Sequence, residues 1–462
     1  NIFLPAGFYY KTFMWPRSFW YRIYEPFIRK AAGFGVASKE HDKERYEHKY
    51  EYCDLLIAGS GPSGLASAYA AAKNGARVIL AEDKPRFGGS LLTSDVSINN
   101  QSGKEWADNI ITELKGMTNV TVKNRAQIFG YYDHNMLVMS ERVTDHLPKS
   151  EEFTPKQRLW YIRAKQVVIS SGSIERPIVF GNNDTPGVVL ASAAKEYMKV
   201  YGVLVGKKPI VFTNNDSAYE TAIEFKKNNI NPIVLDSRQD SNSELVKEAK
   251  SLGIDIKFSH VVVAAKGYKK VKSCDIAEIS EDKQNLNQIK NIECDCICVS
   301  GFWTPTIHLA SQSGGKTKFN EEIDAFVPDK SKQKEVTLGS ANGVFTLEET
   351  LKTSFDKGFE LSKAITNNNN SQQIPKVSEK KHSKHDKFWC VPLPKGKKYK
   401  RFLDFQNDVA VSDIELAIRE GYRSIEHVKR YTTLGMATDQ GKTSNLNGLQ
   451  LVSNIENKVV PA

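Results

Sequence analysis

CDLLIAGSGPSGLASAYAAAKNGARVILAE, residues 53–82, is the stretch of sequence that decides the fold. It opens with a short apolar run, continues through a glycine-rich turn and an alanine-rich segment of helical character, and closes with a second apolar run. This order of strand, turn, helix and strand within one short stretch is typical of a βαβ unit. We therefore predict an α/β fold that is built around this unit.

Three glycines of the turn, Gly59, Gly61 and Gly64, have the spacing G-x-G-x-x-G. In such a turn the first glycine permits the tight bend, the second lets a pyrophosphate approach the backbone, and the third lets helix and strand pack closely. The following helix offers free N–H groups and a partial positive charge to phosphates. The turn therefore predicts a dinucleotide site, with glycines that serve only the bend as the alternative.

An acidic residue, Glu82, ends the second apolar run. A carboxylate at this position can accept hydrogen bonds from the ribose hydroxyls of an adenine nucleotide. It would repel a 2′-phosphate, so NADP is disfavoured despite the neighbouring Lys84 and Arg86.

The rest of the candidate site comes from three further segments. Paired glycines in FGGSL (residues 87–91) can pass close to the pyrophosphate or to the second half of the ligand. Gly172 closes a buried apolar strand, and Ile128 can meet an adenine edge through its backbone. We identify no catalytic residue and no metal ligand. The candidate cofactor-binding residues are Gly59, Ser60, Gly61, Pro62, Ser63, Gly64, Glu82, Asp83, Lys84, Gly88, Gly89, Ser90, Leu91, Ile128, Ser171 and Gly172.

A second βαβ unit is predicted at residues 208–236, but its turn lacks the glycines. Thr213, Asn215 and Ala218 stand where the three glycines should be, and side chains at the first two positions would crowd a pyrophosphate. We expect this unit to keep the fold without binding a second dinucleotide. The polar residues 214–216 can line a channel or an interface instead.

Composition places the chain among ordinary globular proteins. Of its 462 residues 40% are hydrophobic, and no run of about 18 apolar residues occurs, so we predict no transmembrane helix. Six cysteines are too few for a disulfide scaffold and favour a reducing, cytoplasmic location. Cys294, Cys296 and Cys298 alternate on a predicted strand, so we expect all three on one face as small hydrophobic residues.

The basic charge is local. The chain carries 64 Lys and Arg against 54 Asp and Glu, a formal net charge of +10, and its densest basic stretches are residues 379–387 and 395–401. A polar run, residues 367–373, precedes them. Such a segment buries too little apolar surface to offset its ordering entropy, so we interpret it as a solvated linker. We expect no nucleic-acid partner, because aromatic residues are not interleaved for base stacking, and no membrane partner.

Six separated segments resemble the α subunit of heterotetrameric sarcosine oxidase. They are FLPAGFYYKTFMWPRSFW (residues 3–20), AGSGPSGLASA (58–68), ERPIVFGNNDTPGV (175–188), VFTNNDSAY (211–219), GFWTPTIHLASQSGGK (301–316) and EGYRSIEHVKRYTTLGMATDQGKTSNLNGL (420–449). In that family the α subunit also carries an N-terminal ferredoxin-like domain and a C-terminal folate domain. Because this chain begins at Asn1 and has neither domain, we expect a fragment of a longer protein.

The resemblance implies a glutathione-reductase-like α/β fold, that of a flavoprotein with two dinucleotide-binding domains, and a small, mostly helical C-terminal domain. It implies a subunit of a flavin-dependent amine oxidoreductase that oxidises sarcosine to glycine, forming H2O2 and methylenetetrahydrofolate. NAD would occupy the first site, FMN would lie at the boundary with the β subunit, and β, γ and δ subunits would be the partners. The chain alone would be inactive. The alternatives are a self-contained FAD-dependent, NAD-linked amine or proline/hydroxyproline dehydrogenase of the α type, and a non-catalytic assembly scaffold.

The late segment LGSANG, residues 338–343, decides between NAD and FAD in this comparison. It resembles the Gly-Asp motif of flavoproteins, whose acid holds the sugar-like chain of FAD. Ser340 stands in place of that acid, so NAD is favoured at the first site, with FAD as the alternative.

The C-terminal region resembles the small 2Fe–2S domain of related amine and opine dehydrogenase α subunits. The positions that carry the cluster's thiolates in that domain hold Asp404, Gln406, Asp439 and Ser444 here, so we predict no iron–sulfur cluster. Residues 429–444 are rich in cations and hydroxyls and can contact a flavin phosphate or stabilise the loop.

The expected organisation follows from these motifs. We expect two short helices within residues 411–432, broken at Gly421, and a helix over residues 106–114. The expected domains are an aromatic N-terminal arm (1–50), a first dinucleotide-binding NAD/FAD domain (51–205 and 320–366), a second, degenerate Rossmann-like domain (206–319), a Lys/Asn-rich linker (367–400), a small helical domain that resembles a 2Fe–2S domain without its cysteines (401–450) and a tail towards a missing folate domain (451–462).

Overall fold

A computed structural model describes residues 15–33, 35–148, 153–366, 368–369 and 373–460 of the chain. The chain divides into two units, residues 1–45 and 46–462. In the described part of the first unit, two short helical turns, Arg17–Phe19 and Trp20–Tyr24, lead into α2 (Glu25–Ala31), and no residue of these elements is buried. The most aromatic part of the expected N-terminal arm, residues 1–14, lies outside the described residues.

The first sheet forms around the predicted βαβ unit. Its strand order is β5-β2-β1-β8-β7-β6, with a short strand, β21, also paired to β8. The four strands β5, β2, β1 and β8 are parallel, and β7 and β6 are antiparallel to their neighbours. The strands are β1 (Tyr46–Ala58), β2 (Val78–Ala81), β5 (Val120–Lys123), β6 (Ala126–Tyr132), β7 (Met136–Arg142), β8 (Gln157–Ile169) and β21 (Glu335–Thr337).

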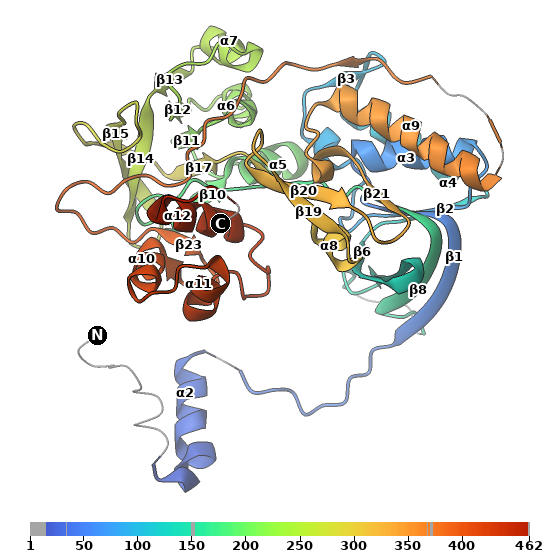
Figure 1. Cartoon of the computed structure of the whole chain (residues 1–462), viewed down its shortest axis with the longest axis horizontal. Coiled ribbons are helices and arrows are strands. Elements are labelled where there is room, and N and C mark those ends of the chain that lie inside the picture. Colours follow the sequence, from blue (N-terminus) through green and yellow to red (C-terminus); the bar gives the residue numbers. More distant parts are fainter. Residues whose placement is uncertain (1–14, 34, 149–152, 367, 370–372, 461–462) are drawn as a thin grey trace. The chain divides into compact units, whose positions relative to one another are not determined.

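Helices α3 (Pro62–Lys73) and α9 (Leu347–Thr366) pack side by side against this sheet, and α4 (Gly103–Lys115) lies next to α3 (Figure 1). Small residues allow the close contact between α3 and α9, because a Cβ atom on Gly358 would lie 2.5 Å from the Ser67 carbonyl oxygen. The predicted strand, helix and strand of the βαβ unit and the predicted helix at 106–114 are therefore confirmed.

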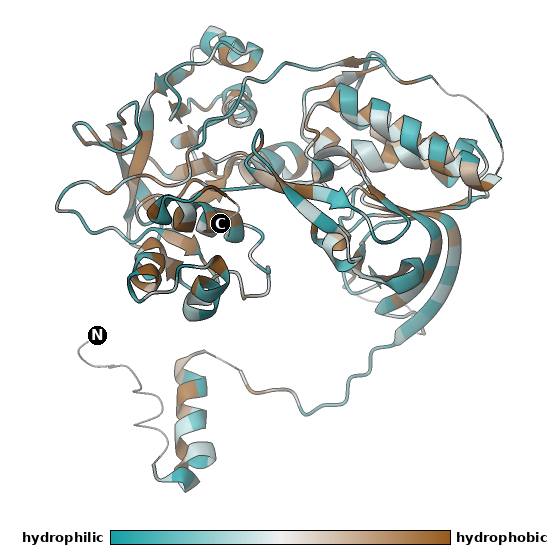
Figure 2. Ribbon diagram, viewed as in Figure 1, coloured by the Kyte–Doolittle hydropathy of each residue, from teal (hydrophilic) through white to brown (hydrophobic). Residues whose placement is uncertain are grey.

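Strand β1 is longer than predicted. We expected a strand over the apolar residues 53–58 only, but β1 begins at Tyr46 and pairs with β8 from its first residue. Its first half is largely exposed and hydrophilic, and its last six residues are buried, a change that Figure 2 shows along the strand. An exposed strand lacks the apolar run by which the buried half was recognised.

The second sheet is entirely parallel, with the strand order β10-β17-β11-β12-β13. Strand β10 and helix α5 precede residue 206 and yet belong to this sheet, so the second layer begins earlier than the boundary that we expected. Its elements are β10 (Val188–Leu190), α5 (Ala191–Tyr201), β11 (Pro209–Thr213), α6 (Ser217–Lys227), β12 (Ile233–Asp236), α7 (Glu244–Ser251), β13 (Asp255–Phe258) and β17 (Cys296–Ser300).

Smaller elements complete the two layers. The antiparallel pair β9 and β18 links the end of the first sheet to the end of the second. The elements are η3 (Gly89–Leu92), β3 (Ser97–Ile98), β4 (Gln101–Ser102), η4 (Asp133–Asn135), β9 (Ser173–Glu175), β14 (His260–Gly267), β15 (Val271–Glu278), β16 (Lys290–Glu293), β18 (Trp303–Pro305), α8 (His308–Gln312), β19 (Lys316–Asn320), β20 (Ala325–Lys330), η5 (Gly339–Asn342) and β22 (Val377–Ser378).

One cysteine lies elsewhere than expected. Cys296 and Cys298 are on β17, face the same cluster and have sulfur atoms 3.7 Å apart. Cys294 precedes the strand and packs with Cys274 in a different cluster. The expectation of one face for all three was therefore wrong, because the chain leaves the alternating geometry before β17 begins.

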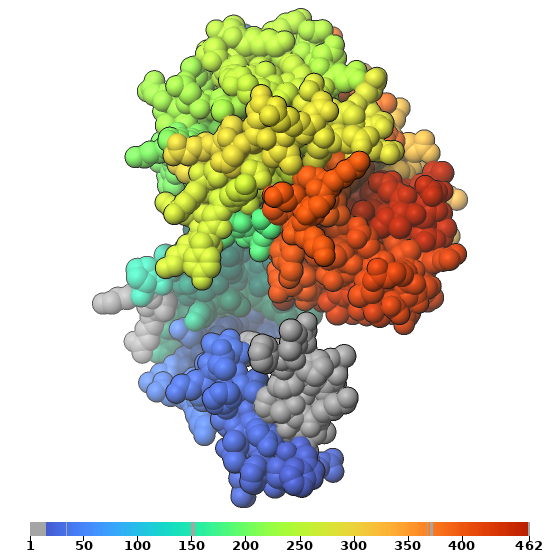
Figure 3. All heavy atoms as spheres, turned by 90° about the vertical axis from the view of Figure 1, so that its left-hand side faces the viewer, coloured from blue at the N-terminus to red at the C-terminus, as the bar shows by residue number. Residues whose placement is uncertain are grey.

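The C-terminal region is helical and packs on the second layer. It begins with the hairpin of β23 (Phe402–Asp404) and β24 (Val409–Ala410). Helices α10 (Val411–Arg419) and α11 (Ile425–Thr432) then flank Gly421, which confirms the predicted break, and α12 (Asn445–Glu456) follows α11. Figure 3 shows this orange and red region against the yellow-green second layer. The Tyr399 hydroxyl donates to an Asp275 carboxylate oxygen at 3.2 Å, and Val179 forms a β-bridge with Cys390. Among the described helices, none is long and apolar enough to span a bilayer.

Candidate functional site

The first and third glycines of the motif are required by the chain itself. Gly59 has φ = +104°, in the left-handed region, and a Cβ atom there would lie 2.4 Å from the Ser170 carbonyl oxygen. A Cβ atom on Gly64 would lie 1.9 Å from the Gly59 carbonyl oxygen, because α3 starts directly against the turn. These two glycines are explained by backbone packing alone.

Gly61 is different, because nothing in the described chain occupies the space beside it. It is the residue before the first turn of α3, its backbone is extended, and a Cβ atom built on it would have no atom within 4 Å. Among the residues that the structure describes, no side chain caps the start of α3. The uncapped N–H groups and the positive end of the α3 dipole therefore face an open space. This arrangement can bind the phosphates of a ligand.

Glu82 is held at the end of β2 by the turn that follows β1. One carboxylate oxygen accepts hydrogen bonds from the Ser60 N–H at 2.9 Å and from the Ser60 hydroxyl at 2.6 Å, and the other accepts from the Lys84 N–H at 2.9 Å. The residue is only 7% exposed, and this burial, together with Asp83, raises the pKa of the carboxyl group. A carboxylate has about four lone-pair positions, so a ribose hydroxyl would compete with the Asp83 side chain for the one that these three bonds leave.

The paired glycines at 88 and 89 lie against the first turn. Both have positive φ, +117° and +52°, and a Cβ atom on Gly89 would lie 2.8 Å from the Gly61 Cα atom. The Gly88 N–H donates to the Ser60 carbonyl oxygen at 3.0 Å. The glycine pair therefore brings a second backbone segment to the same open space.

One cavity joins nearly all of the candidate residues. It has a volume of about 2230 Å³, and every candidate lines it except Gly64 and Gly88, which act through the backbone geometry given above. Gly172 lies in it beside Ser340, whose hydroxyl oxygen would be 3.9 Å from a Cβ atom on that glycine. The sequence-predicted site is thus one connected space.

Sequence reasoning missed the other walls of this cavity. Trp303 and Glu175, from the paired strands β18 and β9, face it, and burial raises the pKa of the Glu175 carboxyl group. Glu379 caps α9, where its carboxylate accepts the N–H groups of Leu347 at 2.8 Å and Glu348 at 2.9 Å. These residues come from distant parts of the chain, and no local motif marks them.

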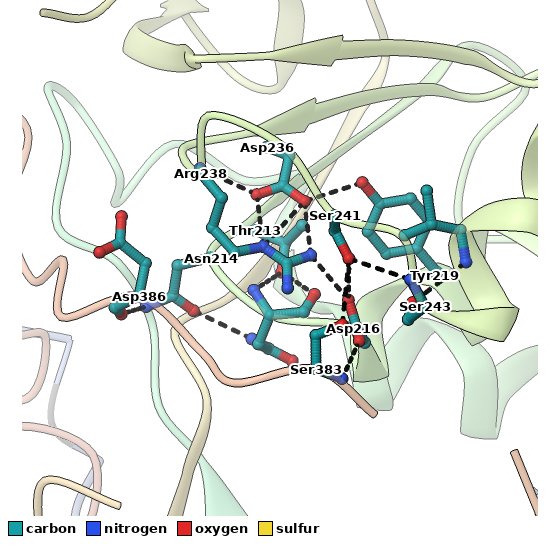
Figure 4. Close-up of polar contacts among 12 residues, drawn as sticks. Thr213, Asn214, Asp216, Tyr219, Asp236, Arg238, Ser241, Ser243, Ser383 and Asp386 are labelled. Atoms are coloured by element: carbon teal, nitrogen blue, oxygen red, sulfur yellow. Dashed lines mark hydrogen bonds and ion pairs between the residues drawn. The ribbon is translucent and has the colours of Figure 1, made fainter. Parts of the chain in front are cut away.

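The second βαβ turn is filled by its own side chains. Thr213, Asn215 and Ala218 are all buried, as is Arg238, which is only 7% exposed. Figure 4 shows the Arg238 guanidinium between two carboxylates, 2.8 Å from an Asp216 oxygen and 2.7 Å from an Asp236 oxygen. Burial opposes the ionisation of Asp216, but Arg238 and the Ser383 amide outweigh it and hold its pKa below the ordinary value.

A part of the expected linker, the crossing segment (residues 379–388), covers this turn. The Ser383 N–H donates to Asp216 at 2.5 Å, the Asp386 N–H donates to the Asn214 carbonyl oxygen at 2.9 Å, and the Asn214 side-chain amide donates back to the Asp386 carbonyl oxygen at 2.7 Å (Figure 4). Ligands of such sheets bind in the crevice outside the carboxyl ends of the strands, which is the crevice that these contacts occupy. This part of the expected linker keeps exposed side chains at residues 381–384 and 387, but its backbone groups pair with a polar turn.

Three of the four positions compared with cluster thiolates hold the C-terminal loop by side-chain hydrogen bonds. Asp404 accepts from the Gly435 N–H at 2.8 Å, and Gln406 accepts from the Thr438 hydroxyl at 2.7 Å. Asp439 accepts from the Gly441 N–H at 3.1 Å, and Ser444 is buried. Across the described ranges, no group of three His, Cys, Asp or Glu side chains could hold a metal ion.

Comparisons with known proteins agree with this geometry. The pyridine nucleotide-disulphide oxidoreductase family matches residues 53–337, and the sarcosine oxidase A3 domain matches residues 398–462. Sarcosine oxidase subunit alpha of Rhizobium meliloti is 39% identical over 98% of this chain and 44% of its own, and that of Corynebacterium sp. (strain P-1) is 34% identical over 91% and 44%. The chain therefore spans less than half the length of these relatives.

The solved structure of L-proline dehydrogenase from P. horikoshii has the same fold, with a TM-score of 0.63 and 19% identity over 92% of this chain and 78% of that one. These matches confirm the resemblance that the six segments indicated and the predicted fold with its helical C-terminal region. A dinucleotide, FAD or NAD, is the class of cofactor that the matched family implies.

Proposed function

This chain belongs to the pyridine nucleotide-disulphide oxidoreductase family and is a homologue of sarcosine oxidase α subunits over nearly its whole length, and from that premise we propose that it is the nucleotide-binding part of such a subunit. Its first site would hold NAD, and the oxidation of sarcosine to glycine would occur in a complex with flavin-bearing partners. The observation that carries the NAD site is the open space beside Gly61, which the chain's own packing leaves unfilled.

Different residues of the site would contact different parts of the ligand. The uncapped start of α3 and the backbones of Gly61 and Gly89 would hold the diphosphate, and Glu82 would accept a hydroxyl of the adenosine ribose. Gly172 and Ser340 lie farther along the same cavity, where the second half of the ligand would extend. NAD supplies a two-electron carrier when it is bound.

Two features favour NAD over FAD. Flavoproteins with the Gly-Asp motif use its acidic side chain to hold the sugar-like chain of FAD, and this chain has Ser340 at that position. The Arg238 ion pairs and the crossing segment fill the second turn, so a flavin in the first site would lack a pyridine-nucleotide partner in the second. Because these contacts fill the second turn, we place the dinucleotide in the first site.

Glu82→Gln should weaken NAD binding by about tenfold to a hundredfold, the value of a hydrogen bond to a charged group. Because the folded pKa of Glu82 is raised, the wild-type affinity should fall as the pH drops through that pKa, where the carboxylate becomes protonated. Calorimetry at neutral pH and at successively lower pH should show this loss in the wild type and a flat profile in the variant. An affinity that is unchanged in Glu82→Gln would remove Glu82 from the site.

The proposed place in a complex is tested by purification from the native source. The chain should co-purify with flavin-containing subunits, and the complex should consume sarcosine and release H2O2. L-proline, and N-methyl amines other than sarcosine, serve as competing substrates, since the amine-binding contacts would lie in a partner. A complex that turns over L-proline and leaves sarcosine untouched would contradict the proposal.

A further inference from the structure

We infer that Glu196, on α5, determines the cofactor's specificity at the 2′ position of the adenosine ribose by holding Lys84 away from a 2′-phosphate. The inference rests on the proposed dinucleotide site. Glu196 belongs to the second layer, so under this inference a residue of the second layer affects which nucleotide binds in the first layer. Glu82 would repel a 2′-phosphate directly, and Glu196 would withdraw the cation that could compensate.

Lys84 is placed at the ribose end of the cavity by its own backbone. Its N–H donates to Glu82 at 2.9 Å, and its side chain lines the cavity beside that carboxylate. The Lys84 ammonium group, however, contacts both carboxylate oxygens of Glu196, at 2.9 and 3.1 Å. Burial lowers the pKa of Lys84, but the Glu196 carboxylate outweighs burial, so the net shift is upward.

Arg86, the second cation after Glu82, is turned to the same helix. Its guanidinium donates to the Val200 carbonyl oxygen at 3.1 Å and lies over the Tyr201 ring, 6.0 Å from the ring centre. A third cation at this edge, Arg142, donates to the Asp83 carbonyl oxygen at 2.8 Å. The side chains of Lys84, Arg86 and Arg142 therefore each already have an acceptor within the chain.

The electrostatic consequence is specific to one phosphate. The diphosphate would meet the start of α3, which is uncapped, whereas a 2′-phosphate would meet the Glu82 carboxylate and a lysine that is already neutralised. The Lys84 side chain is 52% exposed and that of Glu196 is 35% exposed, so releasing the pair does not disturb the core. Freed from Glu196, Lys84 can reach a doubly charged group as a mobile point charge.

The test compares NAD⁺ with NADP⁺, and ADP with 2′,5′-ADP, by calorimetry on the purified protein. The variants are Glu82→Gln, Glu196→Gln and the double variant Glu82→Gln/Glu196→Gln. Glu113→Gln is the matched control, because Glu113 pairs with Lys73 at 3.2 Å and does not line the cavity. ADP affinity in every variant reports whether the site remains intact.

We expect Glu82→Gln to narrow the preference for NAD⁺ over NADP⁺, and the double variant to narrow it by about a further two- to fivefold. This further narrowing should disappear in high salt, because it depends on the exposed charge of Lys84. Lys84→Met, added to the double variant, should also abolish the further narrowing. Glu113→Gln should behave as the wild type.

A double variant with the same NADP⁺ to NAD⁺ ratio as Glu82→Gln, and normal ADP binding, would overturn this inference alone. Wild-type protein that binds neither ADP nor NAD⁺ would overturn the proposed site as well.

Discussion

Gly61→Glu should abolish nucleotide binding while the protein remains folded. The new side chain would enter the open space beside the start of α3 and place a carboxylate where the diphosphate would lie. A like charge at about 4 Å in a partly exposed site costs about 4 kcal/mol, which is close to a thousandfold in affinity. Calorimetry with NAD⁺ measures the loss of binding, and the melting temperature shows whether the protein remains folded.

Two alanine variants separate a loss of binding from a loss of stability. Gly61→Ala fits the extended backbone and the open space, so its stability should match the wild type, with a smaller loss of affinity. Gly64→Ala should instead lower the free energy of unfolding by about 2 kcal/mol, because its Cβ atom would collide with the Gly59 carbonyl oxygen. Unchanged NAD⁺ affinity in Gly61→Glu would refute the site.

Arg238→Met should lower the free energy of unfolding by about 3–5 kcal/mol, the range measured when one partner of a buried ion pair is removed. The variant would leave the Asp216 and Asp236 carboxylates buried without their cation. Denaturant unfolding of the wild type and the variant measures the difference. Arg423→Met is the control, because the side chain of Arg423 is 73% exposed and its loss should change stability little.

The pH dependence of this loss has a definite sign. In the wild type the pKa of Asp216 lies below its unfolded value, so its contribution is present at neutral pH and is lost as the pH falls through the folded pKa. In Arg238→Met burial would dominate and raise that pKa, so the penalty should be largest at neutral pH and shrink in mild acid. A penalty that grows as the pH falls would contradict the ion-pair account.

The turn that we propose for the diphosphate could be predicted because its parts are neighbours in the sequence. Strand, turn, helix and strand follow one another within residues 53–82, and local geometry alone places Glu82 beside Ser60. The three glycines have separate physical reasons, and only the structure distinguishes the packing role of Gly59 and Gly64 from the open space at Gly61.

The remaining walls could not be predicted, because tertiary packing brings them together. Lys84 and Glu196 are 112 residues apart, and no pattern links them. The crossing segment reads as a solvated basic linker, since its apolar content is low, and its order comes from backbone hydrogen bonds to the second turn. The exposed half of β1 was missed for the related reason that its side chains face solvent and its pairing partner is distant.

The central claim, that the space beside Gly61 holds the diphosphate of NAD, is tested most directly by denaturing the purified native protein and identifying the released nucleotide by mass spectrometry. The account predicts NAD in stoichiometric amount, and none from Gly61→Glu prepared in the same way. Release of FAD, or of no nucleotide from protein whose fold is intact, would contradict it.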